Sequence, residues 1–244
     1  MSQKKAIIPN SFTMTNMIFG FFAIIFASKG DPKSLAIAGV LIFAASFFDF
    51  FDGAAARALG VSSPMGTQLD SLADVVAYGI APGFIAYQAF LQHLPEIAMG
   101  LNWGMVIAPI YPVCALYRLA KFNIEGGDQE GFSGLPSPPA GIFISCIPAL
   151  IYTGVPFFDT ITVNVAVHLF IPVYAAVALL MVSSIDYTKF FGDVFKKGKT
   201  AIMITMVVIV LMLFYLKMWG VFLVSGLYII TGVLIYIFRR IKNK

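Results

Sequence analysis

Apolar residues fill eight long stretches of this chain, and short segments rich in charge, glycine or proline separate them. A helix needs about 20 apolar residues to cross the hydrocarbon core of a bilayer, and most of the stretches approach that length. The pattern therefore predicts an all-α integral membrane protein with about eight transmembrane helices. The predicted spans are residues 10–28, 34–57, 66–92, 99–121, 138–155, 162–183, 201–216 and 219–238.

The composition supports this prediction and excludes other classes of protein. Of the 244 residues, 59% are hydrophobic and 11% are charged, and the mean hydropathy is +0.89. Ordinary soluble domains do not reach such values. The net charge is +4, but the basic residues lie between the apolar runs, where an anionic membrane surface attracts them. We therefore expect membrane lipids, and no nucleic acid, among the partners.

The distribution of the basic residues predicts the orientation in the membrane. If the N-terminus is cytoplasmic, only Lys29, Lys33 and Lys217 of the 16 Lys and Arg residues fall on the outer side. Basic loops are retained in the cytoplasm, and this asymmetry requires an even number of spans. Both termini are therefore expected on the cytoplasmic side.

The segment 184–199 carries an amphipathic pattern. Apolar side chains recur at helical spacing from Tyr187 to Phe195, and Lys196, Lys197 and Lys199 follow them. This arrangement is typical of a short helix that lies in the cytoplasmic interface of the membrane. The alternative is a solvated loop with incidental aromatic residues.

Four aspartates interrupt the apolar stretches. Asp49 and Asp52 lie on one stripe of the second predicted helix, and Asp70 and Asp74 lie one turn apart on the third. At about 1.5 Å per residue, both pairs reach a similar depth, roughly 10 Å from the cytoplasmic surface. An unpaired carboxylate in lipid costs about 2.5–3.5 kcal/mol, so cations must compensate four of them. The pattern predicts an all-oxygen site for two divalent cations, Mg²⁺ or Mn²⁺.

Small residues and one arginine surround these carboxylates. Gly53, Ala56 and Gly66 leave room for a ligand to approach the backbone, and Arg57 offers a planar guanidinium suited to phosphate oxygens. Together with two metal ions they indicate a diphosphate ligand in a polar cavity that faces the cytoplasm. The alternative is a structural ion pair among small residues that only serve helix packing.

The same residues form a known motif. The stretch DFFDGAAARALGVSSPMGTQLDSLAD, residues 49–74, fits the pattern DxxDGxxARx8Gx3Dx3D at every fixed position, and it resembles the signature of the CDP-alcohol phosphotransferase family. The resemblance implies a homodimeric enzyme that transfers a phosphatidyl-type group from a CDP-linked lipid to an alcohol and releases CMP. It also implies the residue roles: Asp49, Asp52, Asp70 and Asp74 hold two metal ions, Asp74 is also the general base, and Asp49, Gly53, Ala56, Arg57 and Gly66 bind the CDP-lipid.

Two further stretches narrow the acceptor. CALYRLAKFN (114–123) and FSGLPSPPAG (132–141) are similar to segments of membrane-embedded phosphatidylserine synthases of bacteria and archaea, which commonly have Arg where this chain has Lys121. The resemblance implies CDP-diacylglycerol and L-serine as substrates and the cytoplasmic membrane as the location. Arg118 and Lys121, one turn apart, are expected to bind the serine carboxylate. The alternative is that both only extend to the membrane surface.

The resemblance also divides the chain. It predicts a core of six helices at 1–190, which includes the segment near 184–199, and two additional transmembrane helices at 200–244. Glycines at 79 and 83 and at 100 and 104 permit close helix contacts, either in the homodimer or within the chain. In the first helix, Thr13 and Asn16 are one turn apart and are candidates to reach the cytidine or to bridge neighbouring helices.

Three functional alternatives stay open at the level of sequence. The acceptor could be glycerol phosphate, inositol phosphate or choline instead of serine. The donor could carry an ether-linked archaeol instead of diacylglycerol, because an apolar groove accepts either. A cation transporter could also place acidic residues in its membrane helices, although the glycine and arginine spacing of the motif has no evident use in such a protein.

Overall fold

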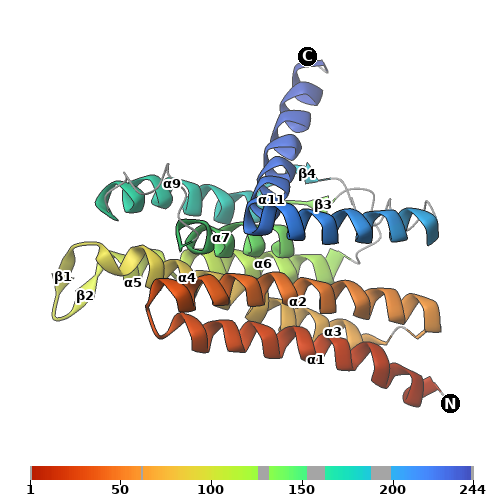
Figure 1. Cartoon of the computed structure of the whole chain (residues 1–244). Coiled ribbons are helices and arrows are strands. Elements are labelled where there is room, and N and C mark those ends of the chain that lie inside the picture. The colour runs from red at the N-terminus through yellow and green to blue at the C-terminus, as the bar shows by residue number, and fades with distance from the viewer. Residues whose placement is uncertain (1, 62, 126–131, 153–162, 188–198, 243–244) are drawn as a thin grey trace.

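The computed structural model describes residues 2–61, 63–125, 132–152, 163–187 and 199–242, and helices make up most of them (Figure 1). The elements in chain order are α1 (Ser2–Ala27), α2 (Pro32–Leu59), α3 (Pro64–Asp74), η1 (Val75–Ile80), α4 (Ala81–Ala89), η2 (Leu91–His93), β1 (Glu96–Ala98), β2 (Leu101–Asn102), α5 (Trp103–Ile107), α6 (Ile110–Glu125), β3 (Phe132–Ser133), α7 (Ser137–Tyr152), α9 (Val163–Val182), β4 (Asp186–Tyr187) and α11 (Lys199–Lys242).

Five helical segments among the described residues are long and apolar enough to cross a bilayer. Two shorter apolar helices, Ser137–Ile151 and Ala166–Val182, accompany them. The prediction of a mostly helical membrane protein is therefore confirmed, whereas the number of eight spans, the side of the termini and the polar cavity stay predictions. The five segments are Ala6–Ala27, Pro32–Leu59, Pro64–Ala89, Trp103–Ile124 and Met218–Lys242.

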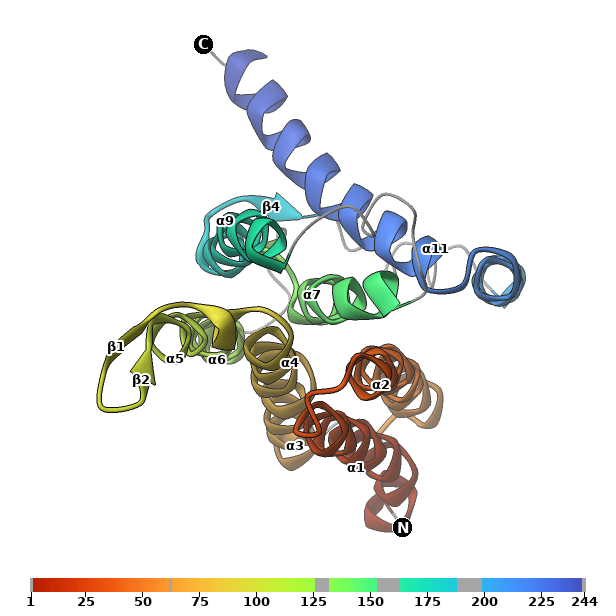
Figure 2. The same ribbon diagram turned by 60° about the vertical axis from the view of Figure 1, so that its left-hand side comes forward.

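Helix α7 occupies the middle of the bundle. Figure 2, which looks nearly along most of the helices, shows α7 with α2, α9 and α11 around it. One buried apolar cluster joins α1, α2, η1 and α4, and a second joins α4, α6, α7, α9 and α11. Residues of α4 and α7 pack in both clusters, so these two helices join the clusters into one bundle.

A short turn leads from α2 to α3. Gly60 ends α2 in the left-handed conformation, φ 63°, which glycine adopts without steric cost. Ser63 then caps α3 by accepting a hydrogen bond from the Gly66 amide at 3.0 Å, and Pro64 fills the first turn, where an amide hydrogen has no helical partner. The aspartate-bearing ends of both helices therefore stay at the same end of the bundle.

The helix that carries Asp70 and Asp74 widens directly after Asp74. Val75–Ile80 is a π-helix, in which the amide of Ala81 donates to the carbonyl of Val76. Pro82 gives the reason, because proline has no amide hydrogen and its ring crowds the carbonyl four residues earlier. The α-helical pattern resumes in α4.

Two glycines let neighbouring helices press against this π-helix. A Cβ atom at Gly20 of α1 would lie 2.7 Å from the Cα atom of Ala77, and one at Gly141 of α7 would lie 3.0 Å from the Cα atom of Tyr78. The first distance is shorter than real Cβ contacts, and the second is at their short limit. The turn next to the aspartates is therefore held from two sides.

The glycine spacing at 79 and 83 serves packing within the chain. A Cβ atom at Gly79 would lie 3.3 Å from that of Ala115, and one at Gly83 would lie 3.0 Å from the Pro112 ring. Both neighbours belong to α6. Of the two interpretations of this spacing, the structure supports intramolecular packing, and the homodimer stays a prediction.

The predicted start of a helix at residue 99 is wrong. Strands β1 and β2 form a small antiparallel hairpin there. Its turn residues, Met99 and Gly100, have φ values of 50° and 79°. Two successive positive φ angles are typical of tight hairpin turns and are incompatible with a right-handed helix. The helix therefore begins later, at Trp103.

The predicted interfacial helix at 184–199 is wrong at its start, and its remainder, residues 188–198, lies outside the described residues. Asp186–Tyr187 is a strand, β4, that pairs with β3. The Tyr187 side chain is only 2% exposed. Tyr187 therefore packs inside the protein instead of lying on the membrane surface.

Both predicted C-terminal spans fall within one helix, α11. Figures 1 and 2 show that α11 changes direction partway and that its last part crosses the other helices steeply. This last part is the candidate span Met218–Lys242. The division into a core at 1–190 and two additional transmembrane helices at 200–244 stays a prediction.

Candidate active site

Three of the four aspartates converge on one place. Carboxylate oxygens of Asp49, Asp70 and Asp74 all lie within 4.8 Å of one another. Asp49 comes from α2, and the other two lie one turn apart on α3. Asp74 is buried, and its two neighbours are half-buried. The structure thus joins carboxylates from both helices in a single group, as the sequence pattern predicts.

Asp52 lies beside this group instead of within it. The side chain is buried, and its Oδ2 accepts a hydrogen bond from Thr13 Oγ1 at 2.7 Å. It remains within electrostatic range of Asp70. The fourth carboxylate is therefore held by α1 at the edge of the site.

Asn16 supports Asp74 in a similar way. Its Nδ2 donates to Asp74 Oδ1 at 3.3 Å, and the side chain is completely buried. Thr13 and Asn16 therefore bridge neighbouring helices, which was one of the two roles considered for them. Their partners, the candidate metal-binding carboxylates, were not predicted. The available signal was two polar residues one turn apart in an otherwise apolar helix.

The candidate nucleotide-binding residues lie at the adjoining ends of α2 and α3. A Cβ atom at Gly53 would lie 3.2 Å from Nη1 of Arg57, so the guanidinium covers this glycine. Gly66 lies near Asn10, whose Oδ1 would be 3.5 Å from an added Cβ atom. Ala56, which lies between these two glycines in the sequence, is half-buried. Side chains of polar residues thus lie over both glycines.

The donor set fits a hard divalent cation. Among the described residues, the buried Oδ1 of Asp70 accepts no hydrogen bond. A buried oxygen without a donor is unfavourable, and crowded carboxylates repel one another. A cation that prefers oxygen ligands removes both penalties, which Mg²⁺ and Mn²⁺ do.

Arg118 enters the site from α6. Its side chain is buried, and Nη1 donates to Ser137 Oγ, at the first residue of α7, at 2.8 Å. The guanidinium also acts electrostatically on Asp74. A buried cation with several donors therefore borders the carboxylate group.

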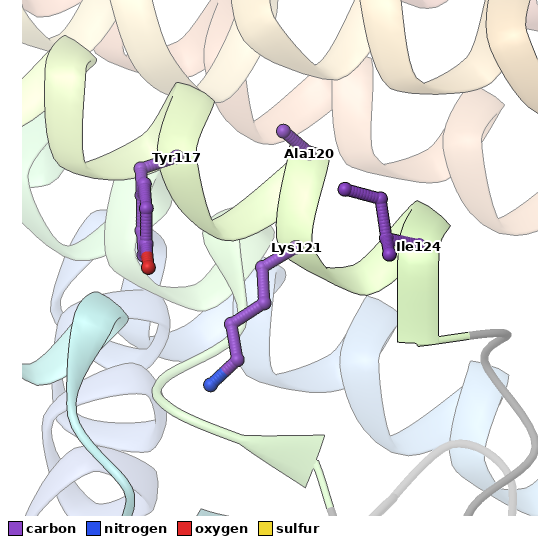
Figure 3. A pocket seen from close by; sticks show the side chains of 4 residues that line it. All are labelled: Tyr117, Ala120, Lys121 and Ile124. Carbon is purple, nitrogen blue, oxygen red and sulfur yellow. The ribbon is translucent and has the colours of Figure 1, made fainter.

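Lys121 lies elsewhere on the same helix. It lines a shallow pocket of about 190 Å³ together with Tyr117, Ala120 and Ile124, all of α6 (Figure 3). These three neighbours are exposed. Lys121 is half-buried, whereas Arg118 is buried, and the joint binding of the serine carboxylate by both residues stays a prediction.

Two further polar features near the site were not anticipated. Ser71 of α3 and Asn123 of α6 are hydrogen-bonded, with the Asn123 Nδ2 at 2.9 Å from the Ser71 Oγ. The hydroxyl of Tyr78 is fully buried and has no hydrogen-bond partner among the described residues. The first contact joins α3 to α6 beside the aspartates, and no sequence signal connects residues so far apart in the chain.

Comparison with known proteins identifies the class. A family model described as CDP-alcohol phosphatidyltransferase matches residues 6–172, more than half of the chain. This region includes the aspartate motif and Arg118. The chain therefore belongs to the CDP-alcohol phosphatidyltransferase family, and it is a membrane-bound phosphotransferase enzyme.

Similar curated proteins carry more specific names than the family. The CDP-diacylglycerol–serine O-phosphatidyltransferase of Bacillus subtilis is 40% identical over 146 residues, which cover 60% of this chain and 76% of the relative. An enzyme of the same name from Helicobacter pylori is 29% identical over 243 residues, 97% of this chain and 93% of the relative. The archaetidylserine synthase of Methanothermobacter thermautotrophicus is 30% identical over 188 residues, 76% of this chain and 71% of the relative.

Proposed function

We propose that this enzyme transfers the phosphatidyl group of CDP-diacylglycerol to L-serine, forming phosphatidylserine and CMP. The observation that carries this proposal is the convergence of Asp49, Asp70 and Asp74 next to the buried Arg118. Such a site combines ligands for divalent cations with a cation suited to the carboxylate of an amino acid. The names of the relatives from Bacillus and Helicobacter agree with this pair of substrates.

Divalent cations would be held by the aspartate group. Asp49, Asp70 and Asp74 supply oxygens within 4.8 Å of one another, and Asp52 supplies a fourth carboxylate at the edge. When bound, two Mg²⁺ or Mn²⁺ ions would neutralise the diphosphate and the charge that develops on the departing CMP. The hydrogen bonds from Thr13 and Asn16 hold two of these carboxylates in fixed orientations.

The protein groups then position the two substrates. The backbone around Gly53, Ala56 and Gly66 accepts the CDP part of the lipid, with Arg57 donating to phosphate oxygens. Asp74 accepts the proton of the serine hydroxyl, whose oxygen bonds to the phosphorus that carries diacylglycerol. The bond from that phosphorus to the bridging oxygen breaks, and CMP leaves with the electron pair.

Arg118 is the proposed partner of the serine carboxylate. It is buried beside Asp74 and fixed by Ser137, so a bound carboxylate would place the serine hydroxyl near the proposed base. Lys121 lines a separate pocket on the outer face of α6. We therefore assign the carboxylate to Arg118 and leave Lys121 a peripheral place.

The test is the release of CMP by the purified protein in detergent. Serine, glycerol 3-phosphate, inositol phosphate and choline are compared as acceptors in the presence of Mg²⁺ or Mn²⁺. We expect CMP release only with serine. Release that depends on another alcohol, or transport of cations by reconstituted protein without CMP release, would contradict the proposal.

An ether-linked donor is a second candidate. The archaetidylserine synthase from Methanothermobacter is 30% identical over 188 residues, nearly the same level as the full-length Helicobacter relative. The aspartate site acts on the diphosphate, which both donors share. Parallel assays with CDP-diacylglycerol and CDP-archaeol decide between them through the ratio of kcat/KM values.

We also propose that the site opens to the cytoplasm and that the enzyme is a homodimer in the cytoplasmic membrane. The bias of Lys and Arg toward one set of loops supports the orientation. The water-soluble substrate serine and the product CMP are then on the side where metabolism supplies and uses them. Labelling of single cysteines from either side tests the orientation.

Arg118→Gln should raise the KM for serine about 10- to 100-fold, because hydrogen bonds to a charged group contribute about 1.5–3 kcal/mol. The KM for CDP-diacylglycerol should stay unchanged. Steady-state CMP release at varied concentrations of each substrate measures both values. Arg239→Gln, at an exposed position near the end of α11, is the matched control. Equal losses for both substrates would refute the assignment of Arg118.

Thr13→Val should lower the rate of CMP release about tenfold, because Asp52 loses a hydrogen bond to a buried charge. Thr15→Val is the matched control, since the Thr15 hydroxyl bonds only to the Ser11 carbonyl of its own helix, at 2.8 Å, among the contacts described. The rates of both variants are compared at saturating substrates. A loss of the same size in both would show that Thr13 acts through helix α1 and not through Asp52.

A further inference from the structure

Helix α6 packs antiparallel along η1 and α4. Gly83 of α4 lies against the Pro112 ring, 3.0 Å from where its Cβ atom would be. A Cβ atom at Gly79 of η1 would lie 3.3 Å from that of Ala115, further along α6. Contacts between small residues bring two membrane helices close, whereas hydrogen bonds depend strongly on distance and angle. A polar contact at this interface therefore defines the alignment of the two helices most sharply.

Such a polar contact lies at the end of the interface nearest the start of α3. The Nδ2 of Asn123 in α6 donates to the Oγ of Ser71 in α3 at 2.9 Å. The Ser71 hydroxyl in turn lies 3.2 Å from the Oδ1 of Asn123 and can donate to it. Both side chains are half-buried. The Ser71–Asn123 pair therefore connects α6 directly to the helix that carries two of the aspartates.

The pair and the glycine contacts agree on one register. One residue more separates Ser71 from Gly83 than separates Pro112 from Asn123. The π-helix η1 lies between Ser71 and Gly83, and a π-turn takes up one residue more than an α-turn of the same length. The two stretches are therefore equally long, and both ends of the interface fix α6 at the same height.

This register sets the height of Arg118 relative to Asp74. Counted from the Ser71–Asn123 pair in the same direction, Arg118 lies about 7.5 Å along α6 and Asp74 about 4.5 Å along α3. The two Cα atoms are therefore offset by only about 3 Å along the helix axes. The electrostatic action of Arg118 on Asp74 agrees with this closeness. A slip of one helical turn would move Arg118 by about 5.4 Å.

We propose that Ser71 and Asn123 are positioning residues, whose hydrogen-bonded pair holds α6 in register with α3 and so sets the spacing between Arg118 and Asp74. This inference rests on the proposed function, in which Arg118 binds the serine carboxylate and Asp74 accepts the proton of the serine hydroxyl. Serine is short and has to reach both groups at once, so a shift of about 1 Å between them already lowers the rate. In this role neither Ser71 nor Asn123 touches the reacting atoms.

The first test compares Ser71→Thr with Ser71→Val in the full-length enzyme. The two variants have the same shape, but only threonine keeps the hydroxyl. We expect kcat/KM for serine to be about three- to tenfold lower in Ser71→Val than in Ser71→Thr, the range for one hydrogen-bonding group. The KM for CDP-diacylglycerol should be the same in both. Steady-state CMP release measures these constants, and equal kcat/KM values for serine would overturn the proposal.

A double-mutant cycle tests whether the two side chains act as one pair. Ser71→Ala and Asn123→Ala should each lower kcat/KM for serine by a similar factor, and the double variant should show no further loss. Ser225→Ala is the matched control and should match the wild type, because the Ser225 hydroxyl donates to the Val221 carbonyl of its own helix at 2.8 Å. A loss in Asn123→Ala without one in Ser71→Ala would overturn the proposal, since Asn123 would then act without Ser71.

A second cycle separates positioning from a general structural effect. In the Arg118→Gln background, Ser71→Val and Ser71→Thr should have equal kcat/KM values for serine, because the group whose position matters is gone. A difference as large as in the wild-type background would overturn the proposal. So would equal losses for serine and for CDP-diacylglycerol in Ser71→Val, which a merely structural role produces.

Failure of the proposed function gives a different result. A wild-type enzyme that releases CMP with another alcohol, and not with serine, overturns both proposals. A wild-type enzyme that uses serine, with equal serine kcat/KM in Ser71→Thr and Ser71→Val, overturns only the role of the Ser71–Asn123 pair. The variants and the acceptor panel therefore distinguish the two.

Discussion

Asp74→Asn should reduce serine-dependent CMP release by about 1,000-fold or more. Asparagine keeps the size of the side chain but cannot accept the proton of the serine hydroxyl, and general-base catalysis typically contributes about 10²- to 10⁴-fold. The change also removes one of three carboxylates that lie within 4.8 Å of one another. The measurement is the single-turnover rate with both substrates saturating.

Asp31→Asn is the matched control for this substitution. Asp31 caps α2 at an exposed position by accepting from the Ser34 amide at 2.9 Å, and asparagine caps helices about as well as aspartate. Its activity should remain that of the wild type. The melting temperature of Asp74→Asn should not fall, because a carboxylate is removed from a crowded group. If Asp74→Asn kept more than a tenth of wild-type activity, Asp74 would be excluded as the general base.

Removal of divalent cations should lower the rate of CMP release about 1,000-fold or more. This loss is equivalent to about 4 kcal/mol of transition-state stabilisation. The physical reason is the crowding of Asp49, Asp70 and Asp74, which need positive charge before a diphosphate can approach. Chelation by EDTA followed by addition of Mg²⁺ or Mn²⁺ checks the effect and its reversal.

Binding of Mn²⁺ gives an independent measurement. Electron paramagnetic resonance of the protein with Mn²⁺ alone, without substrates, should detect bound ion in the wild type and in Asp31→Asn. Asp70→Asn should bind it much more weakly, because the buried Oδ1 of Asp70 is a carboxylate oxygen of the group that accepts no hydrogen bond among the described residues. Full turnover in EDTA, or unchanged Mn²⁺ binding by Asp70→Asn, would contradict the metal assignment.

The meeting of the aspartates could be predicted because it depends on local geometry. The spacing of Asp49 and Asp52, and of Asp70 and Asp74, fixes one face on each helix. Gly60 and the Ser63 cap keep the connection short. The lipid leaves the polar faces only one another to contact. Helical periodicity was sufficient to predict that Asp49, Asp70 and Asp74 meet, but not that Asp52 lies beside their group.

The supporting contacts could not be predicted, because they join residues far apart in the chain. The hydrogen bonds from Thr13 to Asp52 and from Asn16 to Asp74 span 39 and 58 positions. Periodicity tells that Thr13 and Asn16 share a face, but not which helix this face meets. The partner depends on the close approach of α1 at Gly20, which is a property of the assembled bundle.

Arg118 shows what one helix alone does not reveal. Its spacing to Lys121 predicts a shared ligand, which stays a prediction, but it gives no sign of the hydrogen bond from Arg118 to Ser137 at the start of α7. Tyr187 is a second example. Its amphipathic surroundings indicated a membrane-surface helix, but pairing of β4 with β3 buries it. Tertiary contacts decided both cases.

The π-helix at Val75–Ile80 sets the rotational phase between two working surfaces. Before it, Asp74 faces Asp49, and after it, Gly83 seats Pro112 of α6. A π-turn accommodates one residue more than the α-turn that it replaces, so the extra residue does not rotate the helix beyond it. If the same residues formed an ordinary α-helix, everything downstream would be rotated by about 100°, and Gly83 would turn away from its proline. The width of this turn therefore keeps the carboxylate group and the packing surface of α4 aligned.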